Sequence, residues 1–509
     1  QYVKNKEGKI VMNKQIKMSY IHFAIGMAIM LVFWFIPVGV LPNVTKVGME
    51  VLGVFIGTIY MWSTLDPSTA SLTSVVMLGI TGIVGPDGAY PAIGGYLTAA
   101  FGNPTVVQMF FLMVFMGGLT QRRITAYIGR WVMTRKFIEG RPWVFTTIIM
   151  VAAFLMATFI GCFAPIFLFW PILEGVFDDV GFKKTDLYPK LMMMSIVICA
   201  LIAFPVPPYM GNGLALLGNY RGIVVNFESL LGFENVMVNN ASYFISLFVT
   251  GIILVFCQVG LMKFFFKPDV TPMKNVTIEK LNANPLPPMN FGQKFYGGML
   301  IVFIACMLLP TMLPSLPGMS FLNANGFIIP MALCAICCLI KDETGPALNF
   351  EKVMGSTFSW PTYWLCLAAI MIGSVLTNGT TGIVPFLNTI LSPIFSGMSV
   401  TVFTIVLVLV VVLLTNFCNS LVIGMIMQPV VLTYCVGANT NPAPLITLLI
   451  FTVLMTAACT PAASPFAAML FGNKTWLTSG EVYKYSVAYV VVEVVVIIVV
   501  GIPLINFLV

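Results

Sequence analysis

The chain has 509 residues, of which 59% are hydrophobic and only 8% are charged. An ordinary soluble domain carries roughly 25% charged residues, so this composition, with a mean hydropathy of +0.99, excludes a soluble globular protein. It predicts an all-α integral membrane protein that crosses the bilayer several times. The 25 Lys and Arg outnumber the 18 Asp and Glu, which in membrane proteins is typical of basic cytoplasmic loops. We expect no nucleic acid as a partner.

The composition gives no support for a metal or redox centre. The 11 Cys lie singly or as neighbours in apolar runs, and His22 is the single His of the chain. A zinc site made of Cys residues needs two CxxC motifs, and the sequence has no such pair. For this reason we interpret the Cys side chains as small buried apolar groups. We therefore expect no cofactor.

Apolar runs long enough to cross a membrane recur along the chain, since about 20 such residues span a hydrocarbon core of about 30 Å. The first run follows a polar, Lys-rich segment and is too long for a cleaved signal peptide, so we expect a span there. Two blocks, 143–182 and 399–436, are too long for one crossing and are interpreted as re-entrant hairpins. About eleven spans are predicted, near residues 18–41, 46–64, 69–84, 98–120, 188–220, 241–265, 293–314, 324–340, 357–377, 443–472 and 483–508.

The positive-inside rule orients these spans. With a cytoplasmic amino terminus, and with each overlong block entering and leaving on one side, every Lys and Arg except Lys46 and Arg221 falls on the cytoplasmic side. If block 143–182 crossed only once, the basic segment 183–190 would move outside. We therefore expect the first hairpin to open to the cytoplasm and the second to open outward. The expected location is the plasma membrane, which for a bacterium is the inner membrane.

The two halves of the chain share a sequence pattern. FGNPT at 101–105 matches FSWPT at 358–362, and at the same offset Thr158 matches Thr415. A constant offset indicates an internal repeat. Because the predicted topology runs the two halves in opposite directions, they are inverted repeats, which are typical of secondary transporters.

Each repeat contains a span, a hairpin and a second span that proline interrupts. The interruptions are FPVPPYMGNG at 204–213 and TPAASPFAAML at 460–470. Proline removes a hydrogen-bond donor and breaks the helix, which leaves helix ends inside the membrane. Such ends direct N–H groups at anions and C=O groups at cations. The pattern predicts a binding site at the two interruptions, near the midplane of the membrane.

One polar cluster stands out in the apolar stretch LLTNFCNSLVIGMIMQPVV at 413–431: Thr415, Asn416, Asn419 and Ser420. An unpaired amide in hydrocarbon costs several kcal/mol. These residues fall at the predicted tip of the second hairpin, facing the broken span of the same repeat, and we interpret them as ligands of a solute or ion. The alternative is that they hold neighbouring helices together.

In its layout, nearly the whole chain resembles the divalent anion/sodium symporter (DASS) family of the ion transporter superfamily. That family has eleven spans, two hairpins that open to opposite sides, and Ser-Asn-Thr motifs at both tips facing unwound loops that contain Pro-Pro. In this chain Pro207-Pro208 with Asn212 resembles the first loop, and Ser464-Pro465 resembles the second. The second loop lacks the family's Asn after proline.

The two hairpin tips match the family motif to different degrees. Cys418-Asn419-Ser420 resembles Ser-Asn-Thr, whereas counting back from Pro429 aligns the segment 419–421 instead. The first tip has Gly-Cys-Phe at 161–163, without the amide or the hydroxyls. The resemblance implies that both tips and both loops hold the substrate, through Gly161, Cys162, Phe163, Pro208, Asn212, Cys418, Asn419, Ser420, Ser464 and Pro465. It also implies sodium ligands from side chains or backbone carbonyls at Thr158, Gly161, Thr415, Asn416, Asn419, Thr460 and Ala463.

The resemblance implies a secondary active transporter of a small organic anion, a carboxylate, coupled to sodium and working by elevator-type alternating access as a homodimer in the lipid bilayer. The scaffold is expected at 1–97 and 241–350, and the transport unit at 98–240 and 351–509. Phe163 replaces a hydroxyl of the family, which favours a substrate with an apolar or aromatic portion, or with one carboxylate. The degenerate first motif leaves open a proton-coupled transporter or an exchanger of a monocarboxylate or an aromatic solute.

Four further polar residues have both a functional and a structural interpretation. Glu493, within VVVEVVV, is either a proton or cation site or a protonated or hydrogen-bonded carboxylic acid at a helix contact. Asp66 before Pro67 has the form of a helix cap, His22 is expected to pack at the membrane surface, and Glu174 is expected to be solvated near the cytoplasmic mouth.

Two other classes of membrane protein fit the sequence less well. A channel would need continuous polar faces, whereas polarity here is concentrated at the two interruptions. An intramembrane enzyme would need a catalytic motif, and the sequence has no G-x-S-x-G, no H-E-x-x-H and no Walker A loop. We therefore expect a transporter and no enzyme.

Overall fold

A computed structural model gives the structure of the chain. It describes residues 2–4, 10–12, 14–83, 93–124, 126–128, 139–225, 227, 231–232, 236–275, 287–313, 315–343, 345–376, 378–386, 389, 397–417, 419–461, 463–473 and 475–509.

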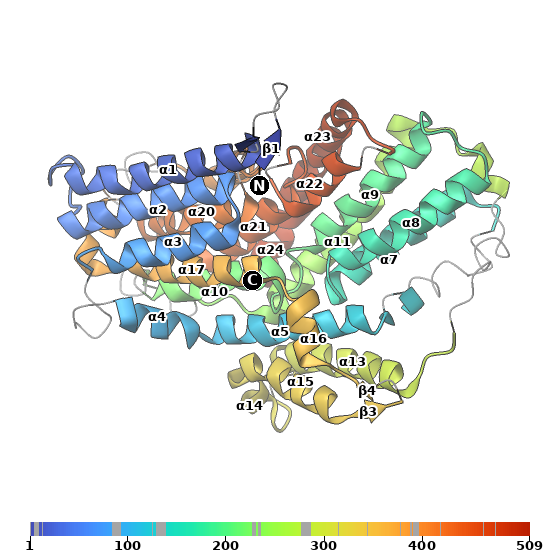
Figure 1. The fold of residues 1–509 in the computed structure, drawn as a ribbon, viewed down its shortest axis with the longest axis horizontal. Coiled ribbons are helices and arrows are strands. Elements are labelled where there is room, and N and C mark those ends of the chain that lie inside the picture. The colour runs from blue at the N-terminus through green and yellow to red at the C-terminus, as the bar shows by residue number, and fades with distance from the viewer. Residues whose placement is uncertain are drawn as a thin grey trace.

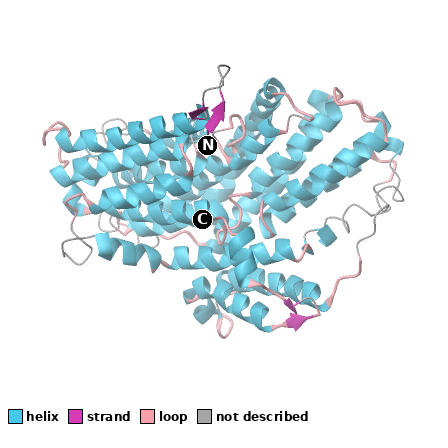
Figure 2. Cartoon of the chain, viewed as in Figure 1, coloured by secondary structure: helices cyan, strands magenta, loops and turns pink. Residues whose placement is uncertain are grey.

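The described chain is almost entirely helical, as Figures 1 and 2 show. Two short antiparallel strand pairs, β1 (Tyr2–Lys4) with β2 (Ile10–Met12) and β3 (Lys341–Asp342) with β4 (Gly345–Pro346), are the exceptions among the described residues. The helices are α1 (Lys14–Phe35), α2 (Lys46–Thr64), α3 (Pro67–Gly79), α4 (Ile93–Phe101), α5 (Pro104–Gln121), α7 (Pro142–Phe159), α8 (Phe163–Asp179), α9 (Leu187–Ala203), α10 (Gly211–Val224), α11 (Asn240–Gly260), α13 (Phe291–Met312), α14 (Met319–Ala324), α15 (Ile329–Leu339), α16 (Phe350–Ser356), α17 (Trp360–Leu376), α19 (Val400–Phe417), α20 (Ser420–Ala438), α21 (Pro442–Met455), α22 (Pro465–Gly472), α23 (Ser479–Val496) and α24 (Ile502–Leu508). Short 3₁₀ segments are η3 (Thr271–Asn275), η4 (Gly326–Ile328) and η5 (Gly379–Thr381), and π-helical segments are η2 (Leu261–Phe266) and η6 (Ile497–Gly501).

The prediction of an all-α membrane protein is confirmed. Within the described ranges, 8 helices are long and apolar enough to cross a bilayer, or up to 9 if the bent pair α16 and α17 forms one span. The predicted spans 188–220 and 443–472 are each divided into two shorter helices, α9 with α10 and α21 with α22. Three features of the helices make this count by length differ from the predicted count. The helices of the two spans broken by proline are too short to be counted, α3 and α15 have only 13 and 11 residues, and α7, α19 and α20 of the predicted hairpins are long enough to be counted.

Both overlong blocks form helical hairpins at the predicted places. Helices α7 and α8 pack against each other and meet at residues 160–162. Helices α19 and α20 also pack together, and at their far ends the rings of Phe403 and Tyr434 stack with centroids 3.6 Å apart. We call α7–α8 hairpin one and α19–α20 hairpin two.

The repeated motif marks a helix boundary in both halves, which the predicted continuous spans did not include. In FGNPT, Asn103 caps α5 by accepting a hydrogen bond from Thr105 N, and Pro104 is the first helical residue. In FSWPT, α16 ends just before the motif and α17 begins within it, with an angle of 84° between their axes. The residue before a proline disfavours helical backbone, so an aromatic-x-x-Pro-Thr pattern interrupts an apolar run that hydropathy alone treats as continuous.

The prediction that Asp66 is a helix cap is confirmed, because its carboxylate accepts hydrogen bonds from Ser68 N and Thr69 N at the start of α3. His22 Nδ1 lies 2.8 Å from Tyr60 Oη, which joins α1 to α2. Trp476 Nε1 donates to Glu174 Oε1 at 2.9 Å, so Glu174 has a partner in this fold.

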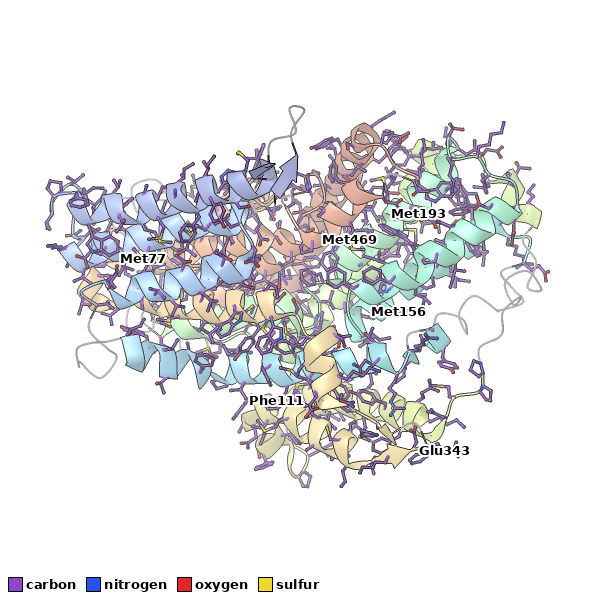
Figure 3. All side chains as sticks on the ribbon, viewed as in Figure 1. Met77, Phe111, Met156, Met193, Glu343 and Met469 are labelled. Atoms are coloured by element: carbon purple, nitrogen blue, oxygen red, sulfur yellow. The ribbon has the colours of Figure 1, made fainter. Side chains whose placement is uncertain are left out.

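The helices form three groups that are visible in Figure 1. Helices α1, α2, α3 and α17 pack together at one end, and α7, α8, α9, α11 and α23 pack together at the other. Helices α13, α14 and α15 lie against α5 as a separate layer. Methionine fills spaces in all this apolar packing: Met77, Met156 and Met193 are buried on different helices, and Figure 3 labels them.

Arg122, which follows α5, connects this helix to the α13–α15 layer. Its guanidinium forms an ion pair with Asp342 at 3.2 Å and donates to Pro346 O and, at 2.9 Å, to Ala347 O. The side chains of Arg122 and Asp342 are only 14% and 6% exposed. A buried ion pair of this kind is costly to break, because either partner left alone is a charge removed from water.

We predict that R122A lowers the free energy of unfolding by about 3 kcal/mol, the lower end of the cost of breaking a buried ion pair. Thermal unfolding of the purified protein, followed by intrinsic fluorescence, measures this effect. D178A is the matched control, because it removes the exposed Lys184–Asp178 pair, which we expect to contribute less than about 1 kcal/mol. Equal losses in the two variants would contradict the role of Arg122.

Candidate functional site

The tip of hairpin two is docked on the unwound segment between α21 and α22, which we call break two (456–464). Asn416 makes the connection: its Nδ2 donates to Val412 O at 2.8 Å and to Thr456 O at 2.9 Å, and its Oδ1 accepts from Cys459 N at 2.8 Å. One amide side chain thus satisfies two peptide groups of break two. Because the amide is hydrogen-bonded, it avoids the free-energy cost of an unpaired amide in an apolar environment.

Three neighbouring contacts extend the same interface. Thr415 Oγ1 donates to Val453 O at 2.8 Å, and Thr460 Oγ1 donates to Asn416 O at 2.6 Å. Ser420 N donates to Ala463 O at 3.0 Å. The predicted sodium ligands Thr415, Thr460 and Ala463 thus all take part in the contact between hairpin two and the second broken span. A hydroxyl that donates its hydrogen still presents oxygen lone pairs.

The remaining residues of this half divide between capping and the binding cavity. Ser464 Oγ donates to Ala457 O at 2.7 Å and accepts from Ala467 N at 3.1 Å, so it caps α22. Asn419 Oδ1 accepts from Leu421 N at 3.0 Å and caps α20, while no described residue bonds its Nδ2. Cys418 lies outside the described residues.

The tip of hairpin one is built differently. Gly161 has φ of +132°, a conformation that side chains rarely adopt. The Thr158 hydroxyl donates to Phe154 O within α7. Neither Cys162 at the start of α8 nor Met210 at the start of α10 caps its helix with a side chain. In this half the helix amino termini therefore present backbone N–H groups without the side-chain caps found in the other half.

A cavity of about 480 Å³ lies where these parts meet. Both hairpin tips contribute to its wall. The starts of α10 and α22, which follow the two interruptions, also contribute. Helices α5 and α17 close it on the remaining sides. Of the predicted substrate contacts, the wall contains Gly161, Cys162, Phe163, Asn212, Asn419 and Pro465. Ser420 and Ser464 are buried beside it, and Pro208 faces a different cavity.

Aromatic rings and methionines form much of the cavity wall. The ring of Phe466 lies 4.7 Å from that of Phe163 and 5.0 Å from that of Phe204, measured between centroids. These three rings come from hairpin one and from both broken spans. With Met113 and Met116 of α5 they give the cavity a large apolar surface, which suits an organic portion of a ligand.

The polar part of the cavity can hold an anion without a salt bridge. The side chain of Asn212 makes no hydrogen bond to any residue that the structure describes, and Asn212 lies in the uncapped first turn of α10. The first turn of α8 faces the same cavity at Phe163 without a side-chain cap, but Ala164 N there donates to Gly161 O and Pro165 has no N–H, so this turn offers an anion the Phe163 N–H. Helix amino termini attract negative charge through their N–H groups and their dipoles. No Asp or Glu lines the described wall to oppose an anion.

Two further cavities lie on opposite sides of this one. A cavity of about 530 Å³ shares the wall at residues 160–163 and extends to Arg123 at the end of α5, the predicted cytoplasmic side. Another of about 530 Å³ contacts Pro208 and Tyr209 on the other face of the first interruption, together with Arg221. The first interruption therefore separates a space continuous with the predicted cytoplasmic side from a space near the predicted outer side.

The sequence-based prediction missed several residues of the wall. Ser359 and Thr362, whose hydroxyls are 2.7 Å apart, belong to the FSWPT motif, which served only to identify the repeat. Phe204 and Met210 flank the interruption that the prolines marked. The apolar residues of α5 carry no sequence signal that distinguishes them from ordinary core residues.

Comparisons with known proteins agree with this architecture. The sequence profile described as sodium:sulfate symporter transmembrane region matches residues 17–509. The crystal structure of the YdaH transporter of Alcanivorax borkumensis is similar in fold, with a TM-score of 0.57 and 12% sequence identity, over 91% of this chain and 98% of that one. No curated protein sequence matched.

We predict that N416A loosens break two, because it removes the bond to Thr456 O and leaves Cys459 N unpaired, which costs about 1–3 kcal/mol. Hydrogen–deuterium exchange of the amides 456–461 should accelerate by about tenfold or more, as expected for a local loss above 1.4 kcal/mol. The matched control is N419A, which removes one capping bond and should leave these amides unchanged. Equal exchange in the two variants would show that Asn416 does not hold the segment.

Proposed function

Since this chain belongs to the sodium:sulfate symporter family and is a secondary transporter, we propose that it carries a small organic anion with at least one carboxylate, together with sodium ions. Family membership agrees with the resemblance to divalent anion/sodium symporters inferred from the sequence. The proposal rests on one observation above all. Both hairpin tips and both interruptions meet at a single cavity, and two uncapped helix amino termini face it.

The chemistry of the wall supports an organic anion rather than an inorganic one. A carboxylate placed at the first turn of α10 would accept hydrogen bonds from backbone N–H groups and from the amides of Asn212 and Asn419. The rest of the ligand would lie against Phe163, Phe204 and Phe466. Sulfate has no apolar portion to bury there, so this half of the wall would contribute nothing to its binding.

Sodium is proposed at break two. The hydroxyls of Thr415 and Thr460 and the carbonyl of Ala463 gather there, and Asn416 fixes the segment that holds them. Oxygen atoms from hydroxyl and carbonyl groups are the ligands that hard cations prefer. The tip of hairpin one offers only the Thr158 hydroxyl, the Cys162 thiol and backbone groups. We infer one well-formed sodium site and a weaker or lost counterpart in the first repeat.

The proposed cycle is elevator-type alternating access, in which the hairpins and interruptions move against a scaffold. The divisions 98–240 with 351–509 and 1–97 with 241–350 remain our starting proposal. Packing of α11 against α7, α9 and α23 supports including α11 in the moving unit. Contacts of α5 with α15 and of α17 with α3 support counting these two helices with the scaffold. The binding cavity would open in turn to the cytoplasm and to the exterior through the cavities on either side of the first interruption.

The surroundings of the protein are proposed on the same basis. Large apolar side chains such as Ile301 and Phe321 are 70% and 64% exposed on the α13–α14 layer. In a bilayer they would contact lipid or a second copy of the chain, and the family resemblance favours a homodimer. The positive-inside pattern supports a cytoplasmic amino terminus in the plasma membrane.

A second candidate is a proton-coupled transporter or an exchanger of a monocarboxylate or aromatic solute. The observation that favours it is the first tip, where Gly161, Cys162 and Phe163 provide neither amide nor hydroxyl side chains. With fewer oxygen ligands, a second sodium would bind weakly there.

We predict sodium-driven uptake of an organic acid into proteoliposomes containing the full-length protein. The assay compares sodium, potassium and pH gradients with labelled benzoate, succinate and sulfate. N212A, N419A and S464A should each reduce uptake about tenfold or more, because each removes a hydrogen bond at the proposed site worth about 1–3 kcal/mol. N325A, at the exposed end of α14, is the control and should transport normally. Unchanged transport in all three site variants would remove the proposed site.

We further predict that F163T shifts selectivity toward dicarboxylates. Threonine restores a hydroxyl at the first tip and removes an apolar contact, and such changes alter discrimination by about 10-fold to 100-fold. The measurement is the ratio of succinate to benzoate uptake. F167T is the matched control, since Phe167 lies one turn further along α8 and faces the adjoining cavity. Efficient sodium-coupled succinate transport by the unaltered protein would count against the assigned role of Phe163.

A further inference from the structure

Glu493 is a carboxylic acid in a position where water does not reach it. It lies on α23 within the longest apolar helical segment, is 0% exposed, and neither carboxyl oxygen has a hydrogen-bond partner among the described residues. An ionised carboxylate at the centre of a membrane helix costs at least about 2.5 kcal/mol. The described chain gives Glu493 no hydrogen-bond partner, so two interpretations remain, a protonated structural carboxylic acid and a proton or cation site.

The surroundings of Glu493 are rich in acceptors and poor in positive charge. Gln258 of α11 donates through Nε2 to Tyr489 O, one turn before Glu493, but its own Oε1 has no described partner. The Tyr489 hydroxyl lies 2.9 Å from Ser195 Oγ, which donates to Met262 Sδ of η2. No described Lys, Arg or His pairs with Glu493. This polar cluster joins α9, α11 and α23, and it lacks only a positively charged species.

The titratable neighbours on other elements are two thiols. Cys199 of α9 and Cys459 of break two both lie close enough to Glu493 to interact with its charge. Tyr489 is the titratable neighbour on its own helix. Neither a thiol nor a phenol carries a positive charge, so none of these groups can neutralise the carboxylate.

Cys459, one of the two thiols near Glu493, belongs to break two, where sodium is also proposed to bind. Cys459 is half-buried rather than fully buried, and so is the adjacent Thr460. Cys459 N donates to Asn416 Oδ1, the amide that docks hairpin two. A solute that loosens this docking would expose Cys459 further. Four residues after Glu493 the helix changes to the π-helical segment η6, a distortion that is frequent at functional sites.

We propose that Glu493 is a proton-binding site of this carrier, which takes up and releases a proton through break two during the transport cycle. The carboxylate accepts the proton from water and returns it to water, so the step needs no other reactant. This inference builds on the proposed function as a secondary carrier, and it names a second coupling ion. A proton bound at Glu493 would take the place of a sodium ion that the degenerate first tip does not bind.

The test is an infrared pH titration of the reconstituted full-length protein, with the unaltered chain, E493Q, E493M and E50Q. Glutamine has the shape of a protonated glutamic acid, and methionine is an apolar replacement should glutamine disturb folding. The control residue, Glu50, is a second buried acid, 7% exposed, but it accepts a hydrogen bond from Gly82 N at 2.9 Å. The difference spectrum between the unaltered protein and E493Q or E493M isolates the carboxylic acid carbonyl band of Glu493.

We expect this band to shift on transfer to D₂O, to decrease as the pH is raised, and to persist in E50Q. A band that never exchanges or never responds to pH, or no band at all, would overturn the proposal. The titration needs no substrate, so its outcome is independent of whether benzoate, succinate or sulfate is transported. In the uptake assay, an inward proton gradient should stimulate transport by the unaltered protein and by E50Q, and E493Q should lose that stimulation. Retained stimulation in E493Q would likewise overturn it.

Discussion

The fold depends on how an unwound backbone is satisfied inside a membrane. A helix interrupted by proline leaves peptide groups that lipid cannot bond, and each costs on the order of several kcal/mol unless protein or ligand pairs with it. At break two, hairpin two supplies the pairing. Asn416 bonds the peptide groups of Thr456 and Cys459, and Thr460 bonds back to the hairpin. The second tip and the second interruption are therefore one structural unit.

The first repeat solves the same problem differently, and the difference gives the molecule its proposed chemistry. Its interruption and tip leave the amino termini of α8 and α10 without side-chain caps, whereas Asn419 and Ser464 cap the corresponding helices of the second repeat. Capped ends have used their N–H groups, and uncapped ends can direct them at an anion. In our proposal the second repeat binds the cation and holds break two rigid. The first repeat binds the carboxylate and the apolar portion of the substrate.

Much of this arrangement could be predicted from the sequence because its signals are local. Overlong apolar blocks predicted hairpins one and two, and FPVPPYMGNG marked the first interruption, since proline acts on its own helix. What the polar side chains contact could not be predicted. The sequence favoured Asn416 as a ligand of a solute or ion over a helix contact, and only tertiary packing shows that its side chain bonds break two. The bend between α16 and α17 and the π-helical segments beside Glu493 also depend on neighbouring helices, which a single sequence does not specify.

The central claim is that the cavity between the two tips and the two interruptions is where the solute binds. Electron cryo-microscopy of the full-length protein in lipid nanodiscs, with sodium and the best-transported acid of the uptake panel, tests it most directly. We expect density for the acid between the first turn of α10 and Asn419, with its apolar part against Phe163 and Phe466. Density elsewhere, or interruptions wound into continuous helices with no cavity between the tips, would contradict the claim.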